Sequence, residues 1–206
     1  MSDTLSFLTH KTLPLVKTWH ADGTISDYAK PKHFKLETFN FDNIRELSAF
    51  LTILEKRPNT CMIRGKYIGG APGHTLRRKD VFEDRPLHAV MIEVDKYESP
   101  NAYLNPLKAI DAYIENALPA CFHGVSYHWQ LSNSSGHPTK KDVLRAHLWF
   151  WLATPYTSAQ LKAWARNTGD NRSTQEIIAR KLKLLMIHQF RQSHRLGGIK
   201  FKAIKR

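Results

Sequence analysis

The segment VMIEVD, residues 90–95, places two acids inside an otherwise apolar run. Side chains alternate between the two faces of a β-strand, so Glu93 and Asp95 are expected on the same face of a central strand. Two carboxylates held so close repel each other and lose hydration, and a divalent cation removes both penalties. The pair therefore predicts a site for Mg²⁺ or Mn²⁺, which prefer carboxylate and phosphate oxygens. The alternative is a solvated strand edge on which the acids pair with Arg85 or Lys96.

A second group of polar residues follows further along the chain. The turn-like segment LSNSSG, residues 131–136, offers hydroxyl and backbone N–H groups that suit phosphate oxygens. In the strand-like segment LRAHLWFWL, residues 144–152, Arg145 and His147 are two positions apart and so share a face. If this strand lies beside the acid strand, a phosphate site adjoins the metal site. The alternative for His147 is an ordinary core histidine, and we expect His128 to serve packing.

Apolar periodicity and turn residues divide the chain into elements. Strands are expected at 13–19, 35–39, 61–64, 88–95, 127–132 and 144–152, and helices after Asp42, over 106–118 and over 157–166. From residue 88 onward, the order strand, helix, strand, strand, helix fits an antiparallel or mixed sheet with helices packed on one face. We therefore expect an α+β fold, with modules at about 1–80 and about 81–171.

The chain is strongly basic: its 206 residues carry a formal net charge of +13. Ten Lys and Arg residues but only one Glu fall within residues 172–206, so this tail supplies +9 of that charge. Such an excess favours polyanions, nucleic acid above all. No apolar run approaches the roughly 18 residues of a membrane span, and the first residues lack a signal-peptide pattern. We therefore expect a cytoplasmic protein without a membrane partner.

The tail, residues 172–206, is expected to form a capped helix followed by an edge strand. Its cations would contact the phosphates of nucleic acid rather than the bases. The alternative is that the apolar stripe of this helix packs on the core while its charges are solvated. The residues predicted to bind nucleic acid, in the tail and in two loops, are Arg77, Arg78, Lys79, Lys140, Lys141, Arg180, Lys181 and Lys183.

Four segments together resemble a known family: MIRG at 62–65, VMIEVD at 90–95, HWQLSNSSG at 128–136 and RAHLWFWL at 145–152. The acid-x-acid strand, the later Ser-Gly turn, and the histidine before an aromatic run are similar to motifs I and II of the archaeo-eukaryotic primase superfamily. The closest resemblance is to the primase–polymerase domains of bacterial plasmids and phages, over roughly residues 45–165. The expected architecture is then an RRM-like sheet after a small N-terminal αβ module.

The resemblance assigns roles to individual residues. Glu93 and Asp95 would bind the catalytic metal ions, and His147 would complete the catalytic group. The residues that would hold the nucleoside triphosphate are Ser134, Ser135, His147, Arg145 and Arg64. Two positions depart from the family pattern. The first acid is Glu where the family usually has Asp, and Asp170, in the turn-like segment TGDNRS, is the only nearby candidate for a third metal-binding acid.

The expected activity is that of a metal-dependent primase–polymerase, a nucleotidyltransferase that synthesises primers on single-stranded DNA in plasmid or phage replication. The sequence has no GxxxxGK[ST] phosphate-binding loop, so unwinding would fall to a separate helicase chain. Two alternatives stay open: a catalytically decayed primase fold that binds nucleic acid, and a metal-dependent nuclease or phosphoesterase. The doubtful third acid and the basic tail favour the first alternative, whereas the lack of a His-x-His metal pattern disfavours the second.

Overall fold

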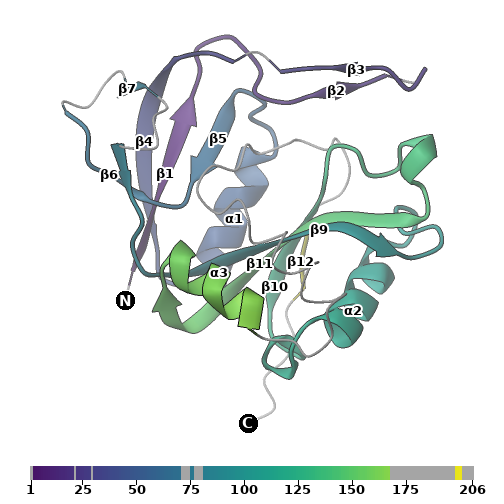
Figure 1. Ribbon diagram of the computed structural model, residues 1–206. Coiled ribbons are helices and arrows are strands. Elements are labelled where there is room, and N and C mark those ends of the chain that lie inside the picture. The colour runs from purple at the N-terminus through teal and green to yellow at the C-terminus, as the bar shows by residue number, and fades with distance from the viewer. Residues whose placement is uncertain are drawn as a thin grey trace.

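The computed structural model describes residues 2–20, 22–28, 30–70, 75–76, 81–167 and 198–200. These residues form two four-stranded sheets with three α-helices (Figure 1), which confirms the expected α+β fold. Two two-stranded sheets accompany them: β2 (Thr18–Trp19) pairs with β3 (Ile25–Ser26) in a hairpin, and β6 (Lys66–Tyr67) pairs with β8 (Phe82–Glu83). Within the described ranges, no helix combines the length and the apolar character needed to cross a membrane.

The N-terminal sheet has the strand order β5-β1-β4-β7. Its strands are β1 (Asp3–Thr9), β4 (His33–Phe41), β5 (Thr60–Ile63) and β7 (Thr75–Leu76), and every pair is antiparallel. The strand expected at 13–19 was wrong, because only β2 occupies its last two residues. The two central strands are β1 and β4, and β1 was not predicted from the sequence.

Helix α1 (Ile44–Leu54) follows β4, and its N-cap is Asn43 rather than the expected Asp42. The Asn43 side chain accepts hydrogen bonds of 3.0 Å from the backbone N–H groups of Arg45 and Glu46. Glu46 reaches back and accepts a hydrogen bond of 2.9 Å from the Asp42 N–H. This arrangement resembles a capping box, except that Glu46 bonds the N–H of the residue before the N-cap, and the helix begins one residue later than expected.

The second sheet has the strand order β12-β10-β11-β9. Its strands are β9 (Leu87–Glu98), β10 (Tyr127–Leu131), β11 (Val143–Tyr156) and β12 (Gly198–Lys200). Because β9 and β10 are both antiparallel to β11, α2 (Pro106–Ala117) connects two parallel strands in a split β-α-β unit. The acid strand, β9, therefore lies at one edge of the described sheet and not at its centre as expected. The RRM-like arrangement stays a prediction.

Both helices of the second module cover one face of this sheet, as expected. The Tyr127 hydroxyl donates a 2.9 Å hydrogen bond to Asp111 of α2. On the same face, the Phe150 ring lies 4.9 Å from Phe122 of the short helix η2 (Ala120–Phe122), which also contacts Trp164 of α3 (Ser158–Asn167). Aromatic packing thus joins β11, η2 and α3.

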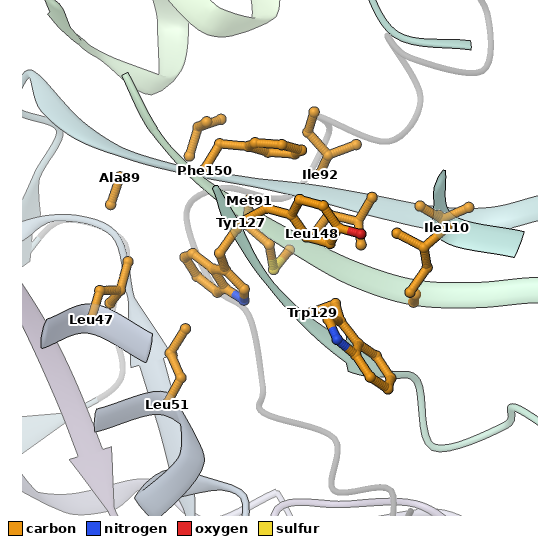
Figure 2. Close-up of a cluster of buried hydrophobic side chains, with 14 of the residues drawn as sticks. Leu47, Leu51, Ala89, Met91, Ile92, Ile110, Tyr127, Trp129, Leu148 and Phe150 are labelled. Carbon is orange, nitrogen blue, oxygen red and sulfur yellow. The ribbon is translucent and has the colours of Figure 1, made fainter. Parts of the chain in front are cut away.

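The opposite face of the second sheet packs against α1 of the N-terminal module. Figure 2 shows Leu47 and Leu51 of α1 on one side of the strands, with Ile92 and Phe150 on the other. One continuous apolar core includes residues from both modules. Along the α1 face, apolar side chains such as Met91 give way to polar ones toward the far end of β9. This change from apolar to polar along one face positions the candidate site.

Candidate functional site

Strands β9 and β11 bring the two predicted polar groups together. Glu93 and His147 are directly opposite in the ladder, which confirms that the acid strand and the Arg–His strand are neighbours. Nε2 of His147 lies 3.8 Å from Oε1 of Glu93. Nη2 of Arg145 donates a 2.8 Å hydrogen bond to Oδ1 of Asp95. Each acid of the pair therefore has a basic neighbour on β11.

A β-bulge shapes the Asp95 end of this arrangement. Val94 pairs with Ala146 and Tyr97 pairs with Leu144, so two residues of β9 lie opposite the single residue Arg145. An extra residue of this kind breaks the alternation of side chains and turns the bulged strand. Tyr97 consequently joins the helix face, where its ring lies 5.2 Å from that of Tyr113. The bulge also lets Asp95 meet Arg145 at the rim of the sheet.

The basic neighbours on β11 reduce the repulsion between the Glu93 and Asp95 carboxylates. The side chains of Asp95 and Arg145 are 35% and 18% exposed. Their contact neutralises one of the two like charges without a metal ion. Arg85, one of the two alternative partners, instead donates to Glu83 at 2.6 Å. In the part of the chain that the structure describes, no group of three or more His, Cys, Asp or Glu side chains is placed to hold a metal ion. Metal binding by Glu93 and Asp95 stays a prediction.

The serine turn after β10 lies beside Arg145. The Ser132 N–H donates to the carbonyl of Arg145 at 2.9 Å, and the Ser135 N–H closes the turn by donating to Ser132. The hydroxyls of Ser132 and Ser134 are 3.3 Å apart, and both residues are buried, whereas Ser135 is half-buried. The structure thus places Ser134 and Ser135 on a tight turn next to the Arg145 strand.

The β2–β3 hairpin of the N-terminal module reaches over this turn (Figure 1). The Asn133 side-chain amide donates to the carbonyl of Lys17, and the Trp19 and His137 rings are 5.0 Å apart. Two predicted nucleic-acid contacts follow on the same loop, where Lys140 ends the short helix η3 (Pro138–Lys140) and Lys141 is exposed. The site therefore lies where the two modules meet.

Gln130 belongs to this site and was missed by the sequence analysis. It is opposite His147 in the β10–β11 ladder, so Gln130, His147 and Glu93 form one row across three strands. Gln130 is only 1% exposed, and its Nε2 has no hydrogen-bond partner; Nε of Arg145 is also buried without a partner. An unmade buried hydrogen bond costs about 1–3 kcal/mol. The sequence does carry a signal for Gln130: it is polar within an apolar strand, and its position two residues after His128 places both side chains on the same face.

Arg64 lies away from this row, so its predicted place in the nucleotide site is corrected. Its guanidinium donates to the carbonyls of Leu87, Ala89 and Tyr156, to the Ser158 hydroxyl at 2.9 Å, and to Asp84 at 3.5 Å. These five contacts use all five donors of the buried side chain, and none is left for a phosphate. Its contacts join β5 to the start of β9, the end of β11 and the start of α3. Burial lowers the pKa of Arg64 to about 10, so it stays charged at neutral pH.

His128 serves packing, as expected. It is fully buried against α1, where its Nδ1 shares a 2.9 Å hydrogen bond with the Ser48 hydroxyl. Burial lowers the pKa of His128 to about 4, which keeps the ring neutral. On the same face of the sheet, His128 is thus packed against α1, whereas His147 lies opposite Glu93 of the predicted metal pair.

Several predicted site residues lie outside the described residues: Asp170, Arg77, Arg78, Lys79, Arg180, Lys181 and Lys183. Their metal-binding and nucleic-acid-binding roles stay predictions. No protein-family model, no curated protein and no solved structure matches the chain. The site itself and the motif resemblance are therefore what indicate a function.

Proposed function

We propose that the protein is a metal-dependent nucleotidyltransferase of the primase–polymerase kind, which extends primers on a single-stranded DNA template. One observation carries the proposal: Glu93 and Asp95 of β9 adjoin His147 and Arg145 of β11. Carboxylates next to a guanidinium, an imidazole and a serine turn provide for metal ions and for phosphates in one place. The motif resemblance supports the same assignment.

In this proposal the protein mainly positions the reactants. The primer 3′-hydroxyl loses its proton to solvent and attacks the α-phosphorus of the incoming nucleotide. The new P–O bond forms, and the bond from the α-phosphorus to the oxygen that bridges to the β-phosphorus breaks to release pyrophosphate. Arg145, His147 and the turn at Ser134 and Ser135 would bind the triphosphate. The template strand would follow basic residues such as Lys140.

Glu93 and Asp95 fit the chemistry of Mg²⁺ or Mn²⁺, because both ions accept one or two carboxylates together with phosphate oxygens. A bound ion would stabilise the charge that develops on the attacking and leaving oxygens. To bind a metal ion, the Asp95 carboxylate would either coordinate the ion while it still contacts Arg145, or break its 2.8 Å contact with Arg145. Exchange of this contact is therefore part of the proposal.

A second candidate is a primase-like protein that binds nucleotide or nucleic acid without catalysis. The Asp95–Arg145 ion pair favours it, because a partner already neutralises one of the two acids. The lack of a three-ligand metal group among the described residues points the same way. Under this candidate, Glu93 and Asp95 shape the site but bind no catalytic ion.

Incorporation of labelled nucleotides on primed and unprimed single-stranded DNA, with Mg²⁺ or Mn²⁺, tests the proposal. Glu93→Gln and Asp95→Asn should each lower incorporation by at least about 100-fold, the scale of losing one transition-state contact. Glu98→Gln is the matched control, because Glu98 is exposed at the end of the same strand. Binding of single-stranded DNA without any incorporation would favour the second candidate. Full activity of Glu93→Gln would contradict the metal-binding role.

A further inference from the structure

Two buried N–H donors on neighbouring strands lack an acceptor. They are Nε2 of Gln130 on β10 and Nε of Arg145 on β11. Buried donors in folded proteins are nearly always paired, and an unpaired one calls for a water molecule, an ion or a ligand that completes it. Two such donors side by side indicate a binding site more strongly than either does alone.

The register of the sheet sets how these donors are spaced. Gln130 is opposite His147, so Arg145 is its diagonal neighbour across the β10–β11 pair. Diagonal neighbours in antiparallel strands have Cβ atoms about 7–8 Å apart, within reach of two long side chains that converge on one group. The ladder is regular here, since the Ser132 N–H donates to the Arg145 carbonyl. The two side chains are therefore long enough for both donors to reach a single ligand.

The surrounding groups select the chemistry of that ligand. Arg145 already gives Nη2 to Asp95, so its Nε is a separate donor on the same planar guanidinium. The Ser132 and Ser134 hydroxyls share a 3.3 Å hydrogen bond on the adjoining turn, which leaves one of the two O–H groups to donate to a ligand. N–H and O–H donors with a guanidinium charge disfavour a cation and favour an anion with several oxygens. A phosphate group meets this requirement.

We infer that Gln130 binds an oxyanion through Nε2, together with Nε of Arg145. The oxyanion would lie at the β10 side of the row formed by Gln130, His147 and Glu93. The shared chemistry is that of phosphate oxygens. The inference rests on the proposed function only where it names the polyphosphate of an incoming nucleotide as the ligand. A phosphodiester of the nucleic-acid backbone carries the same oxygens and is the other source.

Replacing the donor separates this role from a structural one. Gln130→Met keeps the length of the side chain but removes the amide, and Gln130→Glu replaces the donor with a charged acceptor. Because Nε2 makes no hydrogen bond within the protein, Gln130→Met removes an unsatisfied group and should not lower the melting temperature of the free protein. A structural hydrogen-bonding role predicts a lower melting temperature instead.

Binding of pyrophosphate, of tripolyphosphate and of a single-stranded oligonucleotide to the full chain should be measured by calorimetry, next to thermal unfolding. Gln130→Met should weaken pyrophosphate and tripolyphosphate binding about tenfold, the effect of one lost hydrogen bond to a charged group, and Gln130→Glu should weaken it further. Ser6→Ala is the matched control, because the buried Ser6 hydroxyl donates to the Gly65 carbonyl at 2.8 Å. It should lower the melting temperature and leave pyrophosphate binding unchanged.

The outcomes separate this inference from the proposed function. Loss of pyrophosphate binding in both Gln130 variants supports the inference even if the wild-type protein incorporates no nucleotide. Loss of oligonucleotide binding alone supports the oxyanion site and assigns it to the nucleic-acid backbone. Wild-type affinity for all three probes in both variants overturns the inference, even if nucleotide incorporation is observed. Gln130→Met that melts as early as Ser6→Ala, with unchanged affinities, overturns it as well.

Discussion

Arg64 and Arg145 each place a guanidinium group against β9, one near each end of the strand. Arg64 is buried, and all five of its donors contact protein acceptors, among them the Ala89 carbonyl at 3.3 Å. Arg145 gives one donor to Asp95 at 2.8 Å and keeps Nε buried without a partner. Two arginines thus contact the same strand, and the one at its start uses all of its donors whereas the one at its far end does not.

This difference indicates two roles for the two ends of β9. A fully satisfied buried arginine fixes structure, and here it holds the N-terminal sheet against β9, β11 and α3. A partly satisfied one retains binding capacity, at some expense in stability. If the comparison is correct, substitutions at Arg64 should change stability, and substitutions at Arg145 should change ligand binding.

The largest expected effect is at Arg64. Arg64→Met should lower the free energy of unfolding by about 3–5 kcal/mol, because it leaves Asp84 without its cationic partner and removes the Arg64 donors from three carbonyls, two of them in buried hydrogen bonds. Urea denaturation measures this loss. Arg57→Met is the matched control, since Arg57 is exposed on the turn after α1 and should change stability little. A decrease in the free energy of unfolding below about 1 kcal/mol for Arg64→Met would contradict the structural role of Arg64.

His128 extends the comparison to a histidine and to pH. Burial holds its pKa at about 4, against an ordinary value of 6.5, so the unfolded chain takes up the proton first as pH falls. The stability due to neutral His128 is complete above pH 6.5 and is lost toward pH 4, by about 3 kcal/mol. Glu55, 3.9 Å from Nε2, acts in the opposite sense because burial raises its pKa.

The effect of His128 is therefore measured as the difference between wild type and His128→Gln in urea denaturation from pH 7 to pH 4. The stability of the variant should depend less steeply on pH over this interval. His33→Gln, at an exposed position on β4, should keep the wild-type pH dependence. If wild type and His128→Gln have parallel profiles, burial is not controlling this titration.

A smaller stability effect is expected at Arg145. Arg145→Lys keeps a cation for Asp95, and a partly exposed pair of this kind contributes about 0–1 kcal/mol. Stability should therefore change by less than about 1 kcal/mol, whereas Arg64→Lys should lose several times as much. Pyrophosphate affinity should fall, because lysine lacks Nε and the planar donor group. Equal losses of stability at the two positions would remove the distinction between them.

The smallest effect on stability is expected at Lys141, which is exposed and belongs to neither end of β9. Lys141→Ala should leave unfolding unchanged. If Lys141 neutralises one phosphate of single-stranded DNA, the slope of log affinity against log salt should become shallower by about 0.7. Titrations at several salt concentrations measure this slope. An unchanged slope would remove Lys141 from the predicted nucleic-acid contacts.

The sequence alone determined the elements with strong periodicity and the residue types of the site. Helix α2 was placed within a residue of its observed bounds because Pro106 and a regular apolar stripe define it locally. The i, i+2 spacing of Glu93 and Asp95, and of Arg145 and His147, likewise follows from strand geometry. Local pattern did not reveal β1, because its pairing with β4 and β5 joins segments far apart in the sequence.

Only the tertiary structure decided which polar groups meet and which stay unsatisfied. The edge position of β9, the bulge opposite Arg145 and the register that places Gln130 beside His147 all depend on strand pairing between distant segments. Arg64 follows a strand in the sequence much as a site residue would, yet partners from four other segments use all of its donors. Spacing along a strand fixes the face of a side chain, but the fold supplies its partners, and those partners separate a structural residue from a binding one.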